Sequence, residues 1–377
     1  MNKKLLLFIA LYFSANVLVW GQVPLSFKNR YTAKTFERYE NVYRDSIKRF
    51  VSYEQRLYRN PLMGALELRA ILRDSSASYI PLFQGVPMAA YKIGKDGIEV
   101  RELSAFSREN IPFSSRKYKF DFWIQPQFIA NFGNYNQPVQ SKTNILLNTQ
   151  IYLSRGLVLN GGVTFPIVND LDGQQLNIRP APIYLNQFLA LGKSNFMSIS
   201  CGLFYNDQYG INVQYRKNDF NSNWSYGLEG SLTGFYFFPA NGIYYEKLDQ
   251  FMMLGDVTYR LDRANFLVKL SGGQFMYQDR GARIDLIRQF STVDIGFFVM
   301  KTGNGATLGF NLAVPLFANP ILQGKSARLR MVDEFRWEYN YTRGYNIGER
   351  YRLGYQLDEK LRQYNRGYWQ SMFERWK

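Results

Sequence analysis

The chain has 377 residues, a formal net charge of +16 and an aromatic content of 17%, with no histidine and a single cysteine. Because histidine is the usual general base and metal ligand near neutral pH, its absence excludes histidine-dependent chemistry, including that of barrel-type proteases, phospholipases and lipid A deacylases. The single Cys201 excludes an intrachain disulfide.

Residues 1–21 are predicted to be a signal peptide. Lys3 and Lys4 precede an apolar run from Leu5 to Val19, and Gly21 supplies a small residue at the cleavage point. The alternative is a retained membrane anchor, but the run is shorter than the roughly 20 residues that a helical span needs. Export argues against nucleic acid as a partner. The positive charge then suits an anionic partner such as lipopolysaccharide or an acidic polysaccharide, although scattered basic residues also fit a solvated surface.

Residues 22–115 are predicted to form a small α/β module. Two strands, in YENVYRDS and KRFVSYEQRLY, precede a helix in RNPLMGALELRAILRDSS, and one or two more strands follow in SYIPLFQGVPMAAYKIG. Asn60 is suited to cap the helix and Pro61 to occupy its first turn. Leu62, Ala65 and Leu68 recur with Leu72 on one side, which is typical of an amphipathic helix.

From about residue 116 to 345 the apolar residues fall at every second position. In TLGFNLAVPL (307–316), Leu308, Phe310 and Leu312 alternate with Thr307 and Asn311, which is the period of a strand with unlike faces. We predict about twelve strands, an even number as in bacterial single-chain barrels. They lie in KYKFDFWIQPQFIANF, TNILLNTQIYL, LVLNGGVTF, FMSISCGLFY, YGINVQYR, WSYGLEGSLTGFYF, FMMLGDVTYRL, NFLVKLSGGQFMY, ARIDLIRQF, VDIGFFVMK, TLGFNLAVPL and RMVDEFRWEYNY.

Most connections between these strands are very short, so consecutive strands should pair as an antiparallel meander. One connection, about 168–194, is long. If the first strand runs outward from the periplasm, this loop is extracellular, but the sizeable connection PANGIYYEK then falls on the periplasmic side.

The two faces fit either a membrane barrel or a soluble β-sandwich, which bury opposite faces. Mixed charges on the polar face favour an enclosed barrel interior; its acidic members are Asp121, Glu229, Asp256, Asp285, Asp294, Glu334 and Glu338. Aromatic residues on the apolar face, near strand ends, favour girdles at membrane interfaces; they are Trp224, Tyr226, Tyr236, Tyr259, Trp337, Tyr339 and Tyr341. We therefore predict a mainly β fold, an antiparallel outer-membrane β-barrel preceded by a periplasmic module. Cys201 falls on its lipid side.

Residues 346–377 are predicted to form a C-terminal amphipathic helical tail. One stripe carries Leu357, Leu361, Tyr364, Tyr368, Met372 and Trp376. The tail either lies in the membrane surface or packs against the module.

Two stretches resemble a known family. KLSGGQFMYQDRGARIDLIRQFSTVDIGFFVMKT (269–302), with TLGFNLAVPLF, resembles the outer-membrane YjbH family of exopolysaccharide-associated proteins, also called the GfcD type in capsule systems. YEQRLYRNPLMGALELRAIL resembles the module that precedes a barrel in that family, at Arg56, Tyr58, Pro61, Ala65 and Leu66. The likeness covers roughly residues 40–345. It implies an outer-membrane barrel, in a Gram-negative bacterium, that takes part in production or export of an exopolysaccharide or capsule. The resemblance also implies a second barrel-like half in the long family members, and this chain departs from that pattern.

We accordingly expect a non-enzymatic protein with no catalytic residues, cofactor or metal. Basic side chains of the polar face either contact an acidic glycan or pair with carboxylates to fill the barrel as a plug; they are Lys117, Lys119, Arg216, Arg260, Lys269, Arg283, Arg330 and Arg336. Expected partners are outer-membrane lipid, lipopolysaccharide, acidic polysaccharide and export-machinery proteins. The alternatives are a small-solute porin, a scaffold of another envelope complex such as a secretion system, and an enzyme using a carboxylate pair, for which no pair stands out.

Overall fold

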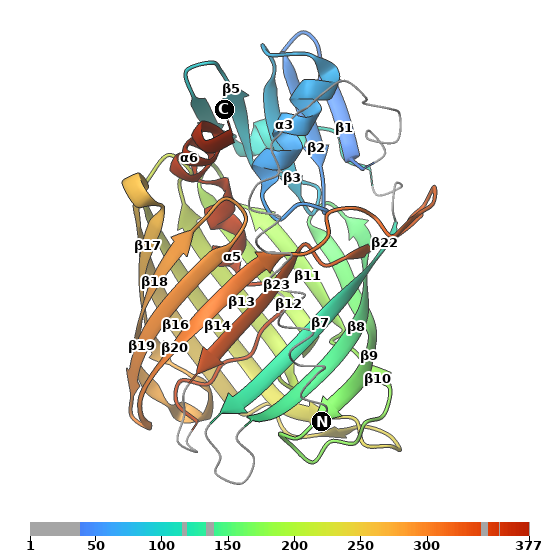
Figure 1. The fold of residues 1–377 in the computed structure, drawn as a ribbon, viewed down its shortest axis with the longest axis vertical. Coiled ribbons are helices and arrows are strands. Elements are labelled where there is room, and N and C mark those ends of the chain that lie inside the picture. The colour runs from blue at the N-terminus through green and yellow to red at the C-terminus, as the bar shows by residue number, and fades with distance from the viewer. Residues whose placement is uncertain (1–37, 115–118, 133–138, 341–345, 354, 377) are drawn as a thin grey trace.

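The computed structural model describes residues 38–114, 119–132, 139–340, 346–353 and 355–376. The fold is mainly β, as predicted, with a small module standing at one end of a long barrel (Figure 1). The expected signal peptide, residues 1–21, lies outside the described part of the chain. Within that part, no helix has both the length and the apolar run needed to cross a membrane.

The N-terminal module is a six-stranded sheet with two helices. Its elements are β1 (Glu40–Asp45), β2 (Phe50–Glu54), α3 (Pro61–Leu72), β3 (Ser78–Phe83), β4 (Val86–Pro87), β5 (Ala89–Ile93), β6 (Ile98–Glu102) and α4 (Ala105–Glu109). The strand order is β1-β2-β3-β5-β6, with β4 beside β3. Helix α3 joins β2 to β3, which are parallel, as such a crossover requires.

Helix α3 begins where the sequence predicts. The side chain of Asn60 accepts a hydrogen bond from the Leu62 backbone N–H at 2.9 Å, and Pro61 occupies the first turn. Leu62, Ala65 and Leu68 are fully buried in the core on one face of the sheet. The predicted cap and apolar stripe are confirmed.

The remaining strands form a closed barrel. They are β7 (Phe120–Phe132), β8 (Val139–Ser154), β9 (Leu157–Asn169), β10 (Arg179–Pro180), β11 (Tyr184–Ala190), β12 (Asn195–Phe204), β13 (Gln208–Asn218), β14 (Trp224–Phe237), β15 (Tyr244–Tyr245), β16 (Gln250–Leu261), β17 (Phe266–Gln274), β18 (Arg280–Gln289), β19 (Asp294–Thr302), β20 (Gly305–Pro315), β21 (Leu322–Gln323), β22 (Ala327–Met331) and β23 (Glu334–Asn340). Short 3-10 turns lie at η1 (Asp262–Ala264) and η2 (Met276–Gln278). Consecutive long strands pair antiparallel.

The prediction of a single long connection at 168–194 was wrong in one respect, because this stretch contains strand β11. β11 pairs with β9 on one side and with β12 on the other. Its sequence YLNQFLA is short, rich in amides and preceded by prolines, so its alternation is weak. The missed strand reverses the direction of every later strand, so the connection 238–249 lies at the same end as the loop 170–183, opposite the module (Figure 1).

The extra strand also changes how the barrel closes. β22 and β23 follow each other with a two-residue interruption; β22 pairs with β7 and β23 pairs with β20. The pairing of β22 with β7 is parallel, unlike the wholly antiparallel arrangement that we expected. With β22 and β23 taken as one interrupted strand, β11 makes the number of long strands odd, so the first and last strands run in the same direction.

The strands expose their apolar face and bury their polar face. On β19, Phe297 and Val299 are each 63% exposed, whereas Asp294 is fully buried. The outward girdle residues Trp224 and Tyr259 lie side by side, with ring centroids 4.6 Å apart. The outward placement of Tyr236 was wrong: it is buried at the loop end, and its hydroxyl donates to the Phe204 carbonyl at 3.1 Å. Tyr341 lies outside the described residues, and Cys201 is exposed.

Candidate functional site: the barrel interior and its plug

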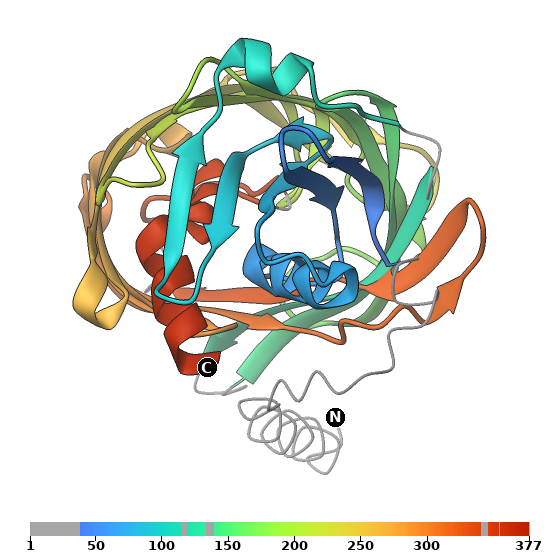
Figure 2. The same cartoon turned by 90° about the horizontal axis from the view of Figure 1, so that it is seen from above.

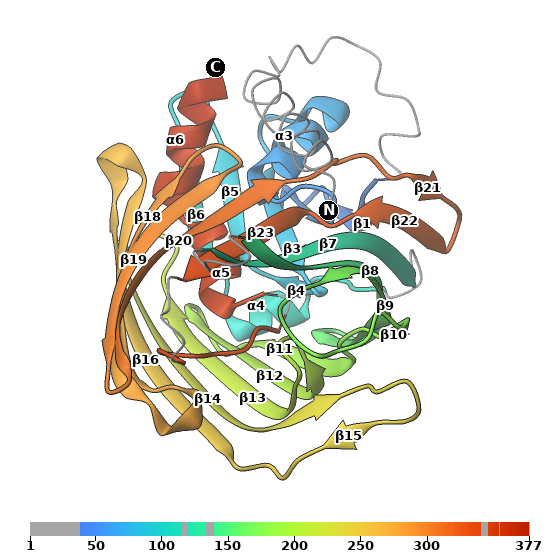
Figure 3. The same cartoon turned by 60° about the horizontal axis from the view of Figure 1, so that its bottom comes forward.

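The C-terminal segment, described over residues 346–353 and 355–376, returns through the inside of the barrel (Figure 3) and ends beside the module (Figure 2). It contains α5 (Leu357–Leu361), the 3-10 turn η3 (Arg362–Tyr364) and α6 (Arg366–Trp376). Figure 3 shows α5 inside the ring of strands, and Figure 2 shows α6 beside the module at the barrel mouth. Of the two predicted positions for the tail, packing against the module is the one observed for α6, which shares the core of the module's sheet.

The first part of this segment is fixed by an apolar cluster inside the barrel. Ile347, Tyr351 and Leu353 are buried together with inward residues of β11, β12, β16 and β19. The Tyr351 ring lies parallel to that of Phe204, with centroids 5.3 Å apart, and its hydroxyl accepts from Asn212 Nδ2 at 2.7 Å. The segment is therefore packed as a core element.

Charged side chains of the segment pair with charged side chains of the barrel wall. The five pairs are Arg350–Glu229 at 2.6 Å, Asp358–Lys269 at 2.7 Å, Glu359–Arg336 at 3.3 Å, Lys360–Asp333 at 3.0 Å and Arg362–Asp294 at 3.0 Å. The segment carries both cations and anions, and each of the five pairs with an opposite charge on a strand or on the β22–β23 interruption. These pairs fix the position of the segment along the barrel axis. A shift of the segment by one residue would place like charges opposite each other, for example Glu359 opposite Asp333 or Lys360 opposite Arg336.

The structure gathers six of the eight predicted basic residues inside the barrel. Arg216 pairs with Asp256 at 2.9 Å, Arg283 with Asp285 at 2.7 Å and Glu338 at 2.9 Å, Arg330 with Asp121 at 2.8 Å, and Arg336 with Glu334 at 3.1 Å. Lys269 pairs with Asp358 of the C-terminal segment, and Arg260 is buried against the same segment, where it donates to the Arg362 carbonyl. Lys119 was wrongly placed: it precedes β7 and is exposed, because the strand starts only at Phe120. Lys117 lies outside the described residues.

A second ionic cluster joins the module to the barrel. Asp121 at the start of β7 is fully buried and contacts Arg56 at 3.2 Å, Arg328 at 2.8 Å and Arg330 at 2.8 Å. Glu40 on β1 completes it, 2.7 Å from Arg56 and 3.0 Å from Arg328. One carboxylate from each domain thus binds arginines of both, which fastens the module at the mouth.

Arg59 makes a similar link just before α3. Its guanidinium lies 2.6 Å from Asp294 of β19 and 2.5 Å from Glu334 of β23, and its side chain is 1% exposed. Because Asp294 is also bound by Arg362, one buried carboxylate connects the module, the barrel wall and the C-terminal segment.

Glu54 at the end of β2 lies beside the cluster that contains Glu40 and Arg56. Its carboxylate accepts from the Gly85 backbone N–H at 3.1 Å, from Tyr152 Oη at 2.7 Å and from Asn41 Nδ2 at 2.8 Å. Burial raises the pKa of this carboxyl and the neighbouring Glu40 raises it further, while Arg56 and the hydrogen bonds from Tyr152 and Asn41 act in the opposite sense. The net shift is upward.

Two of the cavities in the described part of the chain lie beside the C-terminal segment and reach the barrel wall. The larger, about 410 Å³, lies along β7 and β23 among charged groups that include Arg283, Glu338, Arg350 and Arg352. The smaller, about 150 Å³, lies between the module and the barrel wall. Its aromatic lining residues are Tyr53, Tyr58, Phe83, Trp123, Tyr152, Tyr184, Tyr205, Tyr355 and Tyr364. Gln125, Tyr205, Asp333 and Lys360 line both cavities. The Lys360–Asp333 ion pair therefore stands where the two cavities meet.

The charged groups of the interior are engaged in ion pairs with one another. Among the described residues, no group of three or more histidine, cysteine, aspartate or glutamate side chains is arranged to hold a metal ion. Each acidic residue of the polar face is bound by an arginine, as the pairs of Asp256, Asp285 and Glu338 illustrate. What this arrangement offers is a packed ionic interior with two cavities.

A family comparison bears on what such an interior is for. Residues 174–311 match the family model YjbH, described as exopolysaccharide biosynthesis protein YbjH. This range runs from the loop before β11 into β20. The resemblance read from the sequence is thereby confirmed over these residues, and it implies a role in exopolysaccharide biosynthesis. The comparison with curated proteins gave no match, and neither did the comparison with solved structures.

Sequence reasoning missed the tail as the main partner of the barrel interior. Asp358, Glu359, Lys360 and Arg362 are adjacent to one another in the chain and carry both signs of charge, yet the apolar stripe alone was used to place the helix. Mixed charge of this kind, opposite a polar barrel face, is the signal that could have identified the C-terminal segment as the partner of the barrel interior. Arg59 was also missed; it lies beside the family-like residues Tyr58 and Pro61.

Proposed function

We propose that this protein is a non-enzymatic outer-membrane β-barrel protein that takes part in exopolysaccharide or capsule production or export, with its N-terminal module in the periplasm. The observation that carries the membrane location is the inverted alternation of the barrel strands. Leu308 and Phe297 are 64% and 63% exposed, while Asp121 and Asp294 are fully buried. A soluble sandwich buries the opposite face, so hydrocarbon is the natural surrounding of the exposed side chains.

The connections support the orientation. At the module end the links 155–156, 191–194, 262–265 and 290–293 are short, although 316–326 is longer. The opposite end carries the loops 170–183 and 238–249. Bacterial outer-membrane barrels have short periplasmic turns and longer extracellular loops, so the module lies in the periplasm in this proposal.

The filled interior supports an accessory role over that of a porin. The C-terminal segment packs inside the barrel and is bound to the wall by ion pairs. A water-filled pore needs an open passage, whereas here the Lys360–Asp333 ion pair lies where the two cavities meet. Aromatic rings and amides around the smaller cavity, such as Trp123, Tyr205 and Gln125, suit contact with the C–H faces and hydroxyls of a sugar.

Deleting the gene and measuring surface polysaccharide tests the pathway. We expect a reduced coat that returns when the wild-type gene is restored; a normal coat would contradict the proposed pathway. Detergent extraction of the mature protein from envelope fractions tests the membrane location separately. Affinity purification from membranes distinguishes glycan-export partners, which we expect, from the secretion-system partners that the scaffold alternative requires.

A further inference from the structure

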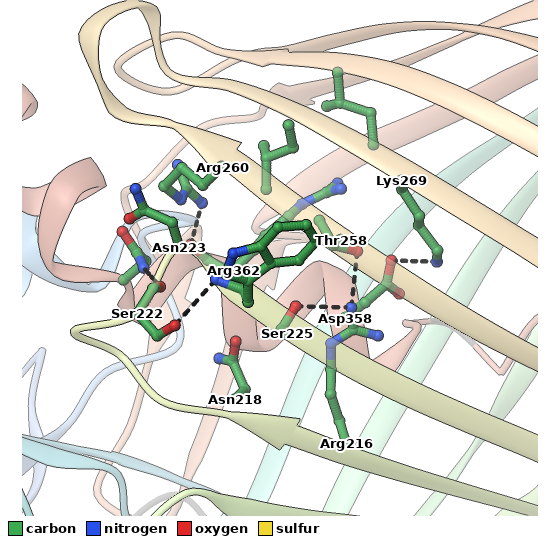
Figure 4. A pocket seen from close by; sticks show the side chains of 14 residues that line it. Arg216, Asn218, Ser222, Asn223, Ser225, Thr258, Arg260, Lys269, Asp358 and Arg362 are labelled. Carbon is green, nitrogen blue, oxygen red and sulfur yellow. Dashed lines mark hydrogen bonds and ion pairs between the residues drawn. The ribbon is translucent and has the colours of Figure 1, made fainter.

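A small pocket at the module end of β13, β14, β16 and β17 is rich in positive charge. Figure 4 shows Arg216, Arg260, Lys269 and Arg362 around it, with Asp358 as the one carboxylate among the residues that line it. Ser222 and Asn223, from the β13–β14 connection, line the pocket as well. The space amounts to about 20 Å³, which is room for about one water-sized particle.

Three of these cations have carboxylate partners. Arg216 pairs with Asp256 at 2.9 Å and Lys269 with Asp358 at 2.7 Å. Arg362 lies 3.0 Å from Asp294, but Asp294 is also bound by Arg59 at 2.6 Å. The carboxylates around the pocket are therefore all engaged, and one of them is shared by two arginines.

Arg260 is the cation left over. It is 3% exposed, and within the described residues no carboxylate lies within ion-pair distance of it. Its Nη2 donates to Gln289 Oε1 at 2.5 Å and to the Arg362 carbonyl at 3.1 Å, both neutral acceptors. Its Nη1 has no acceptor, and neither has Nε of Arg362. Asp262 near the end of β16 is exposed and accepts from Asn223 Nδ2 instead.

A buried arginine without a counter-ion is costly, because its charge is neither hydrated nor neutralised. A water molecule would satisfy the free N–H groups but leave the charge. An anion of atomic size would satisfy both. From this geometry we infer that the pocket binds one chloride-sized monovalent anion, held by Arg260 and Arg362. Larger anions such as phosphate or a sugar carboxylate exceed the space.

The inference is independent of the proposed function and is tested on the purified full-length protein in detergent. Thermal unfolding is measured in sodium chloride and in sodium gluconate at equal ionic strength, since gluconate is too large for the pocket. We expect a midpoint a few degrees higher in chloride, through binding to the folded state alone. The difference should vanish in Arg260→Gln and persist in Arg288→Gln, a control at an exposed arginine of β18.

Bromide supplies a direct measurement that needs no variant. Crystals grown in sodium bromide should give an anomalous peak beside Nη1 of Arg260. Equal midpoints in the two salts for the wild type, a chloride effect that survives in Arg260→Gln, or bromide peaks only elsewhere would each overturn the assignment, and would leave water as the occupant of the pocket.

Discussion

Trp369 of α6 stacks on Tyr91 of β5, with ring centroids 3.7 Å apart and ring planes 19° apart. Both rings are fully buried. The Trp369 Nε1 donates to the Gln363 carbonyl at 2.8 Å, and the Tyr91 hydroxyl donates to the Tyr364 carbonyl at 2.6 Å. Helix α6 and the N-terminal module are thus joined into one unit at the barrel mouth, so the module holds the end of the C-terminal segment.

Replacing Trp369 should loosen this unit. We expect Trp369→Ala to lower the free energy of unfolding by about 3–5 kcal/mol, because a large buried ring is lost and a cavity remains. Trp369→Phe should cost less, since it keeps a ring on Tyr91. Denaturant unfolding of the purified protein in detergent measures both. Trp376→Ala, at a half-buried position near the end of the same helix, is the control; an equal loss there would contradict a specific role for the stack.

Asp121 should be among the least tolerant positions of the barrel. Asp121→Asn removes the charge that Arg56, Arg328 and Arg330 share, so that the buried cluster loses one of its carboxylates. Breaking a buried ion pair costs about 3–5 kcal/mol. We therefore expect a large fall in the unfolding temperature, measured by heating samples in detergent and following the loss of the band of folded protein on electrophoresis. Asp249→Asn, at an exposed carboxylate in the 238–249 loop, should leave that temperature unchanged; a tolerant Asp121→Asn would mean that the cluster contributes little.

The sequence was informative about local elements and uninformative about long-range placement. The cap at Asn60 and the alternation of TLGFNLAVPL are set by neighbouring residues, and both were predictable. Strand β11 is short and polar, so it was missed, and one missed strand reversed the end assigned to the 238–249 loop. The plug could not be deduced from periodicity, because Arg350 and Glu229 are 121 residues apart and meet only once the barrel closes.

The pH dependence of stability should carry a contribution from Glu54. Its pKa is raised in the folded protein, so the folded state holds the proton more tightly than the unfolded state does. This contribution is fully present below the ordinary pKa of a glutamate and is lost as the pH rises through the raised value. We therefore expect the stability of the wild type, relative to Glu54→Gln, to fall as the pH rises above the ordinary pKa of a glutamate, about 4. Parallel midpoint curves for the two proteins across this range would contradict the assignment.

The C-terminal segment should keep the barrel closed to ions. In planar bilayers we expect the full-length protein to give no large, steady conductance, because Ile347, Tyr351, Leu353 and α5 occupy the barrel interior (Figure 3). A variant that ends at residue 345 should conduct if it folds, since the apolar cluster and the five ion pairs to the wall are removed together.

Charge reversal tests the same point without shortening the chain. In the wild type, Glu229 Oε2 lies 2.6 Å from Arg350 Nη2. Arg350→Glu places a second carboxylate opposite Glu229, and the repulsion should release residues 346–353 from the barrel wall. We expect brief opening events that the double variant Arg350→Glu, Glu229→Arg suppresses, because it restores an opposite pair. Arg280→Glu, at an exposed arginine of β18, controls for the change in net charge. Steady conductance from the wild type, or openings in the single variant that the swap does not reduce, would show that the segment is not what closes the barrel.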